Sequence, residues 1–202
     1  MIKYFLFILL FHSSNFSFSQ SSFLFEQISL DSIRSLEDSL NSDILGFVNT
    51  QVGDDYFSSA KSDYTYTPLC FERTNDSFFP ELIIEYFYNE VDSTLLAASY
   101  TWSIMNEITN LKTDGHLLEK EKLRKKDYLA KYKSIKIDLI ELFGSPDLKL
   151  EPKDKKGYFY KLEWIREDIE ILLLLKFSEE LIELPGNMKI GSYEVRVKVN
   201  FL

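Results

Sequence analysis

The last ten residues, YEVRVKVNFL, alternate strictly between apolar and polar side chains. Every second residue from Tyr193 to Phe201 is a valine or an aromatic, and the residues between them are Glu194, Arg196, Lys198 and Asn200. A period of two is that of a β-strand, whose successive side chains point to opposite faces of a sheet. The segment therefore predicts a strand with one face in the core and the other face in water.

Two pairs of strand-forming runs predict two antiparallel hairpins. The runs ELIIEYFY and TLLAASYTW are separated by NEVDS, and the runs GYFYKLEWI and IEILLLLKF are separated by a turn at residues 166–168. A further short strand is expected within residues 64–71, where Pro68 favours the edge of a sheet. These segments indicate a mainly antiparallel sheet.

Apolar spacings of three and four predict two helices. The first is expected at about residues 32–48, where Ile33, Leu36, Leu40 and Ile44 share one face. The second is expected at about residues 117–143, with Gly144 and Pro146 ending it and a stripe of Tyr128, Tyr132, Ile135, Leu139 and Leu142. The sequence thus predicts a single α+β domain over residues 20–202, with about five or six strands and these two helices.

Residues 1–19 have the three-part pattern of a secretory signal peptide. Lys3 precedes an apolar run from residue 4 to 11, and a serine-rich stretch places Ser17 and Ser19 before Gln20. The run is far shorter than the roughly 20 residues that span a membrane. A bacterial lipid anchor would need a cysteine just after the run, but the single cysteine is Cys70. We therefore expect an exported protein, periplasmic or extracellular, that neither spans a membrane nor carries a lipid anchor.

Composition argues against several chemistries. Lys3 is the one charged residue of the leader, so the remainder holds 22 basic and 32 acidic residues, a net charge of 22 − 32 = −10 that disfavours nucleic-acid binding. Only His116 remains among histidines, and glycine-rich phosphate loops are absent, so neither metal nor cofactor is expected. The one nucleophile arrangement is Cys70 with His116 and Asp114.

The triplet Tyr-Phe-Tyr occurs twice, at residues 86–88 and 158–160. Alternation places the tyrosines of each copy on the apolar face of a strand, and Phe87 and Phe159 on the other face. Together with neighbouring aliphatic residues they form a candidate apolar strip: Ile83, Phe87, Phe159, Leu172 and Leu174. Such a strip is either covered by the 32–48 helix or exposed as a binding surface for a partner. We expect coverage, because that helix needs a surface on which to dock.

A helix that ends in LFGSPD, followed by an aromatic hairpin with Trp164, resembles in outline small envelope proteins of the β-lactamase-inhibitor and outer-membrane-assembly kind. Those proteins bind other proteins, and no residue is assigned a role from the resemblance.

Our first hypothesis is an exported, non-catalytic domain that recognises another envelope or extracellular protein. One alternative is a small-ligand binding protein, for lipid or glycan, with a pocket lined by Tyr132, Tyr100 and Trp102 between the long helix and the sheet. The other alternative is a cysteine-dependent hydrolase.

Overall fold

The computed structural model describes residues 23–47, 68–73, 80–103, 125–150, 157–184 and 188–202. The predicted leader (1–19) and the first residues of the predicted long helix (117–124) lie outside these ranges. In chain order the elements are α1 (Leu30–Ser39), β1 (Asp43–Phe47), β2 (Leu69–Arg73), β3 (Leu82–Tyr88), β4 (Leu95–Ser103), α4 (Lys125–Phe143), β5 (Leu148–Leu150), β6 (Gly157–Ile165), β7 (Ile169–Leu184) and β8 (Met188–Phe201).

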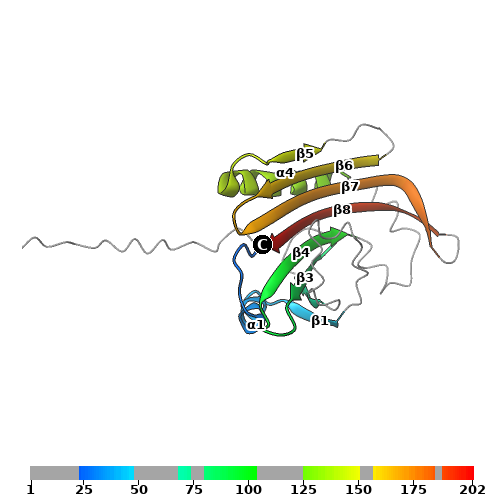
Figure 1. Cartoon of the computed structure of the whole chain (residues 1–202). Coiled ribbons are helices and arrows are strands. Elements are labelled where there is room, and N and C mark those ends of the chain that lie inside the picture. Colours follow the sequence, from blue (N-terminus) through cyan, green and yellow to red (C-terminus); the bar gives the residue numbers. More distant parts are fainter. Residues whose placement is uncertain (1–22, 48–67, 74–79, 104–124, 151–156, 185–187) are drawn as a thin grey trace, which may run out of the picture.

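All the strands belong to one antiparallel sheet with the order β1-β2-β3-β4-β8-β7-β6-β5 (Figure 1). The predicted α+β class is confirmed, although the described residues form eight strands and not five or six. Both predicted hairpins, β3–β4 and β6–β7, are present, and the long strands β7 and β8 form a third. In the middle of the sheet β4 pairs with β8, although the two strands are far apart in the sequence.

The first helix is shorter than its apolar spacing predicts. Ser29 caps its start by accepting a hydrogen bond from the backbone N–H of Ser32 at 3.3 Å. The helix ends at Ser39, and Asn41 takes a left-handed conformation with φ of 53°. The apolar residue Ile44 then lies in β1, paired with Phe71 of β2, so strand pairing outweighs the helical pattern in the second half of the segment.

The long helix α4 packs on β7 and β8 with the predicted stripe. Four of the five residues of that stripe are buried, and Leu142 at its end is exposed. Gly144 follows the helix with φ of 76°, a conformation that favours glycine. The indole Nε1–H of Trp164 donates to the Gly144 carbonyl at 2.8 Å, which fixes this end of the helix to β6.

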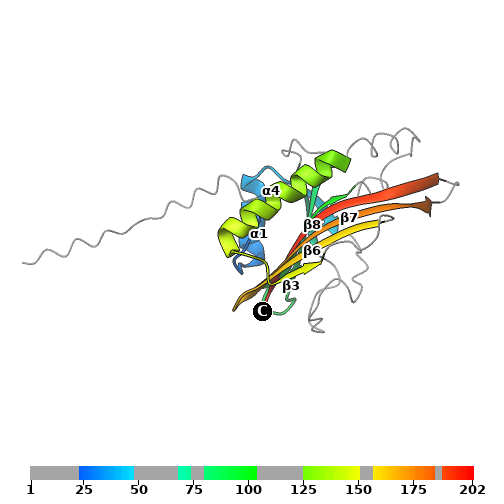
Figure 2. The ribbon, with the colours of Figure 1, turned by 90° about the horizontal axis from the view of Figure 1, so that it is seen from above.

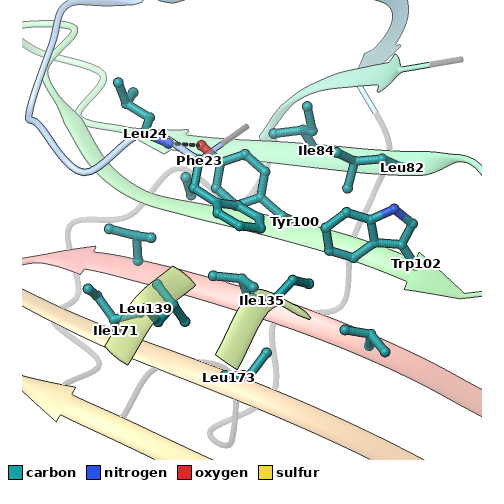
Figure 3. Close-up of a cluster of buried hydrophobic side chains, with 14 of the residues drawn as sticks. Phe23, Leu24, Leu82, Ile84, Tyr100, Trp102, Ile135, Leu139, Ile171 and Leu173 are labelled. Atoms are coloured by element: carbon teal, nitrogen blue, oxygen red, sulfur yellow. Dashed lines mark hydrogen bonds between the residues drawn. The ribbon is translucent and has the colours of Figure 1, made fainter. Parts of the chain in front are cut away.

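Both described helices lie on the same face of the sheet, called here the helix face (Figure 2). Phe23, which precedes α1, packs edge-on against Tyr100 at 5.0 Å and Trp102 at 6.1 Å between ring centroids. Ile135 and Leu139 of α4 belong to the same buried cluster as Ile171 and Leu173 of β7 (Figure 3). The backbone N–H of Leu24 donates to the Tyr100 hydroxyl at 2.8 Å, so the buried phenol oxygen has a hydrogen-bond partner (Figure 3).

A buried ion pair attaches α1 to this face. The carboxylate of Glu37 accepts hydrogen bonds from Arg73 Nε at 3.0 Å and Arg73 Nη2 at 2.5 Å, from the Tyr86 hydroxyl, and from Ser42 Oγ at 2.5 Å. Arg73 and Tyr86 project from the helix face, opposite to Phe87. The expectation that the first helix covers the Phe87 strip is therefore wrong, because the buried charges of the helix have their partners on the other face.

Candidate functional site

The face of the sheet opposite the helices, called here the opposite face, carries the residues of the predicted strip. Strand pairing arranges its side chains in rows that run across the sheet. The central row, from β2 to β5, is Cys70, Glu85, Ser99, Lys198, Leu172, Glu163 and Leu148. A second row, displaced toward the β3–β4 turn, is Phe87, Ala97, Asn200, Glu170 and Ile165.

The structure does not bring the two phenylalanines of the predicted strip together. Phe87 is on β3 and Phe159 is on β6, with β4, β8 and β7 between them. Phe87 is 0% exposed, whereas Phe159 is 44% exposed and pairs with Lys176 of β7. Ile83, Leu172 and Leu174 are half-buried. Phe159 on β6 is therefore the only exposed member of the strip, and the half-buried Leu172 and Leu174 lie on the adjacent strand β7.

That accessible part continues onto β5 and forms what we call the β5–β7 patch. Its members are Leu148, Leu150, Phe159, Ile165, Leu172 and Leu174. The four members on β5 and β6 are between 41% and 55% exposed. An ion pair from Lys161 Nζ to Glu163 Oε2, 3.1 Å long, lies on β6 between the aliphatic residues of β5 and β7. Apolar side chains with charges among them are typical of a recognition surface.

The centre of the opposite face is polar but buried. Lys198 is 2% exposed and Asn200 is 4% exposed, so the prediction that this side of the last strand is in water is wrong for both residues. Ser99, Thr101, Glu85 and Glu170 nearby are also buried. Alternation along a strand shows that its two faces differ in chemistry, but it does not show which residues lie beside the polar ones. The sequence alone therefore does not show that these polar residues are buried.

Burial changes the acidity of Lys198. Removal from water lowers the pKa of its ammonium group to about 7, and the positive charge of Arg196 acts in the same direction. The carboxylates of Glu194, Glu85 and Glu170 oppose this shift. Glu194 also pairs with Arg196, since its Oε1 lies 3.0 Å from Arg196 Nε, while Glu85 lies in the row of Lys198 and Glu170 in the next row.

Asn200 has one end of its side-chain amide engaged. Its Nδ2 donates to Glu170 Oε2 at 3.1 Å. Its Oδ1 is buried and has no hydrogen-bond partner among the described residues.

The two alternative sites receive no such support. Tyr132, Tyr100 and Trp102 are all part of the buried core on the helix face, where Phe23 packs against the latter two. Cys70 is buried on β2 and its Sγ lies 3.5 Å from the Pro68 carbonyl oxygen. Its proposed partners His116 and Asp114 lie outside the described residues.

Within the described ranges, acidic, histidine and cysteine side chains form no group of three that could hold a metal ion. None of the helices described has the length and apolar character needed to cross a membrane. Comparison with family models, curated proteins and solved structures found no match. The opposite face of the sheet is therefore the candidate functional site.

Proposed function

We propose that this chain is an exported, non-catalytic domain that binds another protein through the β5–β7 patch. The observation that carries the proposal is the exposure of Leu148, Leu150, Phe159 and Ile165, which the strand register places on the opposite face of the sheet. Large apolar side chains gathered on one face of a domain are typical of interaction sites, because their transfer out of water stabilises a complex.

Export is supported by the pattern of residues 1–19, in which a lysine, a short apolar run and a serine-rich stretch follow one another. The acidic net charge of the remainder favours a partner that is neutral or basic at its contact surface, because like charges would repel at the rim of the interface. A periplasmic or extracellular protein is therefore the partner class that we propose.

The test is affinity capture from native envelope and culture fractions with the tagged protein as bait. The variant Phe159→Ser with Ile165→Ser removes two of the exposed apolar members of the patch. Val91→Ser is the matched control, because Val91 is exposed in the β3–β4 turn and has the same apolar character. A stoichiometric partner that is lost with the patch variant and kept with the control is expected. Equal capture by both variants would remove the β5–β7 patch as the site.

A further inference from the structure

The side chains of the β5–β7 patch follow an order that is complementary to itself. Strand register divides this part of the opposite face, at one end of the sheet (Figure 1), into four rows. Along β6 the rows are Ile165 with Glu170, then Leu148, Glu163 and Leu172, then Leu150, Lys161 and Leu174, and finally Phe159 with Lys176. The two inner rows differ only in the sign of the central charge. The two outer rows each join an apolar residue to a charge, again of opposite sign.

A second copy of the chain, rotated by 180°, places each row over the row of opposite sign. The two-fold axis lies in the plane of the contact, perpendicular to β6 and midway between Lys161 and Glu163. It exchanges the two inner rows and the two outer rows, so Lys161 of one copy faces Glu163 of the other. Leucine faces leucine on both β5 and β7, and Phe159 faces Ile165. Closed two-fold dimers are the commonest assemblies of identical chains, and their interfaces are self-complementary in this way.

The residues that face each other in this arrangement have surface available for the contact. The four apolar members of the patch on β5 and β6 are between 41% and 55% exposed, and Lys176 is exposed as well. The side chains of Lys161 and Glu163 are 24% and 11% exposed, so both reach the surface. On the next strand, β8, Lys198 and Asn200 are 2% and 4% exposed and lie too deep to meet a second copy.

The charges of the contact surface balance. Lys161 and Lys176 against Glu163 and Glu170 give 2 − 2 = 0, although the chain outside the leader has a net charge of −10. At physiological ionic strength, exposed charges more than about 8 Å apart are largely screened from each other. The repulsion between two acidic chains is therefore weakest at this neutral surface.

The size of the contact predicts a weak dimer. Three strands about 4.8 Å apart and four rows about 6.8 Å apart cover roughly 14 Å by 27 Å, or about 380 Å² per copy. This is about half of the roughly 800 Å² per partner that a standard stable complex buries. We therefore expect a dissociation constant of about 10–100 μM.

We propose that the partner of the β5–β7 patch is a second copy of this chain, bound face to face about a two-fold axis between Lys161 and Glu163. The inference rests on the proposed function, because it uses the same surface, and it adds the identity and the register of the partner. An unrelated partner would not require the inner and outer rows to be opposite in sign.

The first experiment is sedimentation velocity of the exported protein from about 1 to 500 μM in about 0.15 M sodium chloride. A change from monomer to dimer with the stated dissociation constant is expected. Phe159→Ser with Ile165→Ser is expected to weaken the dimer at least about tenfold. The control Lys133→Glu, at an exposed position of α4, is expected to behave like the wild type. A wild type that is monomeric at every concentration would overturn the inference. The proposed function survives that result if the patch still captures a different protein, and falls with it if capture is unaffected by the patch variant.

The second experiment tests the two-fold register by exchanging charges. Lys161→Glu alone and Glu163→Lys alone each place like charges opposite one another and are expected to weaken self-association more than about tenfold. An equimolar mixture of the two variants sets two glutamates on one subunit against two lysines on the other. The mixture is therefore expected to form a heterodimer at least as tight as the wild-type dimer.

The double variant Lys161→Glu with Glu163→Lys restores the original complementarity with the signs exchanged, and it is expected to dimerise like the wild type. Far-UV circular dichroism checks that each variant is folded, and the double variant decides if a single variant is not. A folded pair of single variants that stays monomeric when mixed, a single variant that dimerises like the wild type, or a folded double variant that stays monomeric would refute the two-fold register.

Discussion

Replacing Glu37 by alanine is expected to lower the free energy of unfolding by about 3–5 kcal/mol. The carboxylate is fully buried, and Arg73, which donates two hydrogen bonds to it, is also buried. Without Glu37 the guanidinium group keeps its charge inside the protein and loses this counter-charge. The Tyr86 hydroxyl and Ser42 Oγ lose the same acceptor. Because these contacts attach α1 to the sheet, their loss is expected to lower the stability of the whole native fold.

A double-mutant cycle separates the ion pair from the packing around it. Glu37→Leu alone and Arg73→Met alone are each expected to be strongly destabilising, because each leaves one buried charge without its partner. The combined variant Glu37→Leu with Arg73→Met removes both charges and keeps much of the volume. The free energy of unfolding of this double variant is expected to be within about 1 kcal/mol of the wild-type value, or higher than it.

Urea denaturation followed by circular dichroism at pH 7 gives the four free energies of unfolding that the cycle needs. The cycle is expected to yield a coupling energy of at least about 2 kcal/mol between the two positions. Additive effects of the two single changes would show that Glu37 and Arg73 act separately. The assignment of the pair as the attachment of α1 would then be wrong.

Three further predictions concern the opposite face and the N-terminus. In urea denaturation, Phe87→Ala is expected to lower the free energy of unfolding by about 3–5 kcal/mol and Phe159→Ala by about 1 kcal/mol or less, because Phe87 is buried and Phe159 is exposed. Equal losses would contradict the placement of the two rings. Between about pH 7 and pH 10 the unfolded chain binds more protons at Lys198 than the folded chain, so stability rises with pH by up to about 1.4 kcal/mol per unit. Lys198→Met is expected to remove this rise, and an unchanged pH profile would show that Lys198 keeps its ordinary pKa. Intact mass of the exported protein is expected to begin at Gln20, and a mass that includes Met1 would exclude cleavage there.

The hairpins were predictable because their determinants are local. In the β3–β4 turn the Asn89 side chain accepts from the backbone N–H of Val91 at 2.8 Å, and Ser93 takes a positive φ. Both features belong to the short NEVDS sequence that separates the two strand-forming runs. The pairing of β4 with β8 joins residues about one hundred positions apart, from Ala97 with Asn200 to Ser103 with Glu194, and nothing in either segment identifies the other.

The first helix shows where local pattern is misleading. Ile33 and Leu36 continue in helical spacing to Leu40 and Ile44, so the sequence predicts one long helix. The observed chain leaves the helix after Ser39 and adds β1 to the edge of the sheet beside β2. Backbone pairing at a sheet edge depends on a strand that is distant in the sequence. The spacing of apolar residues along one segment therefore does not show where the helix ends and the strand begins.

The two Tyr-Phe-Tyr triplets demonstrate the same limit at the level of function. Identical local sequence gives each triplet the same strand conformation and the same alternation. The row of Phe87 continues into Ala97 and Asn200 at the centre of the sheet, whereas Phe159 pairs with the exposed Lys176 near its edge. Cross-strand neighbours therefore decide that Phe87 is buried beside polar residues and Phe159 is accessible. Phe87 is therefore not accessible to a partner, whereas Phe159 belongs to the proposed protein interface, although the sequence presents the two residues as equivalent.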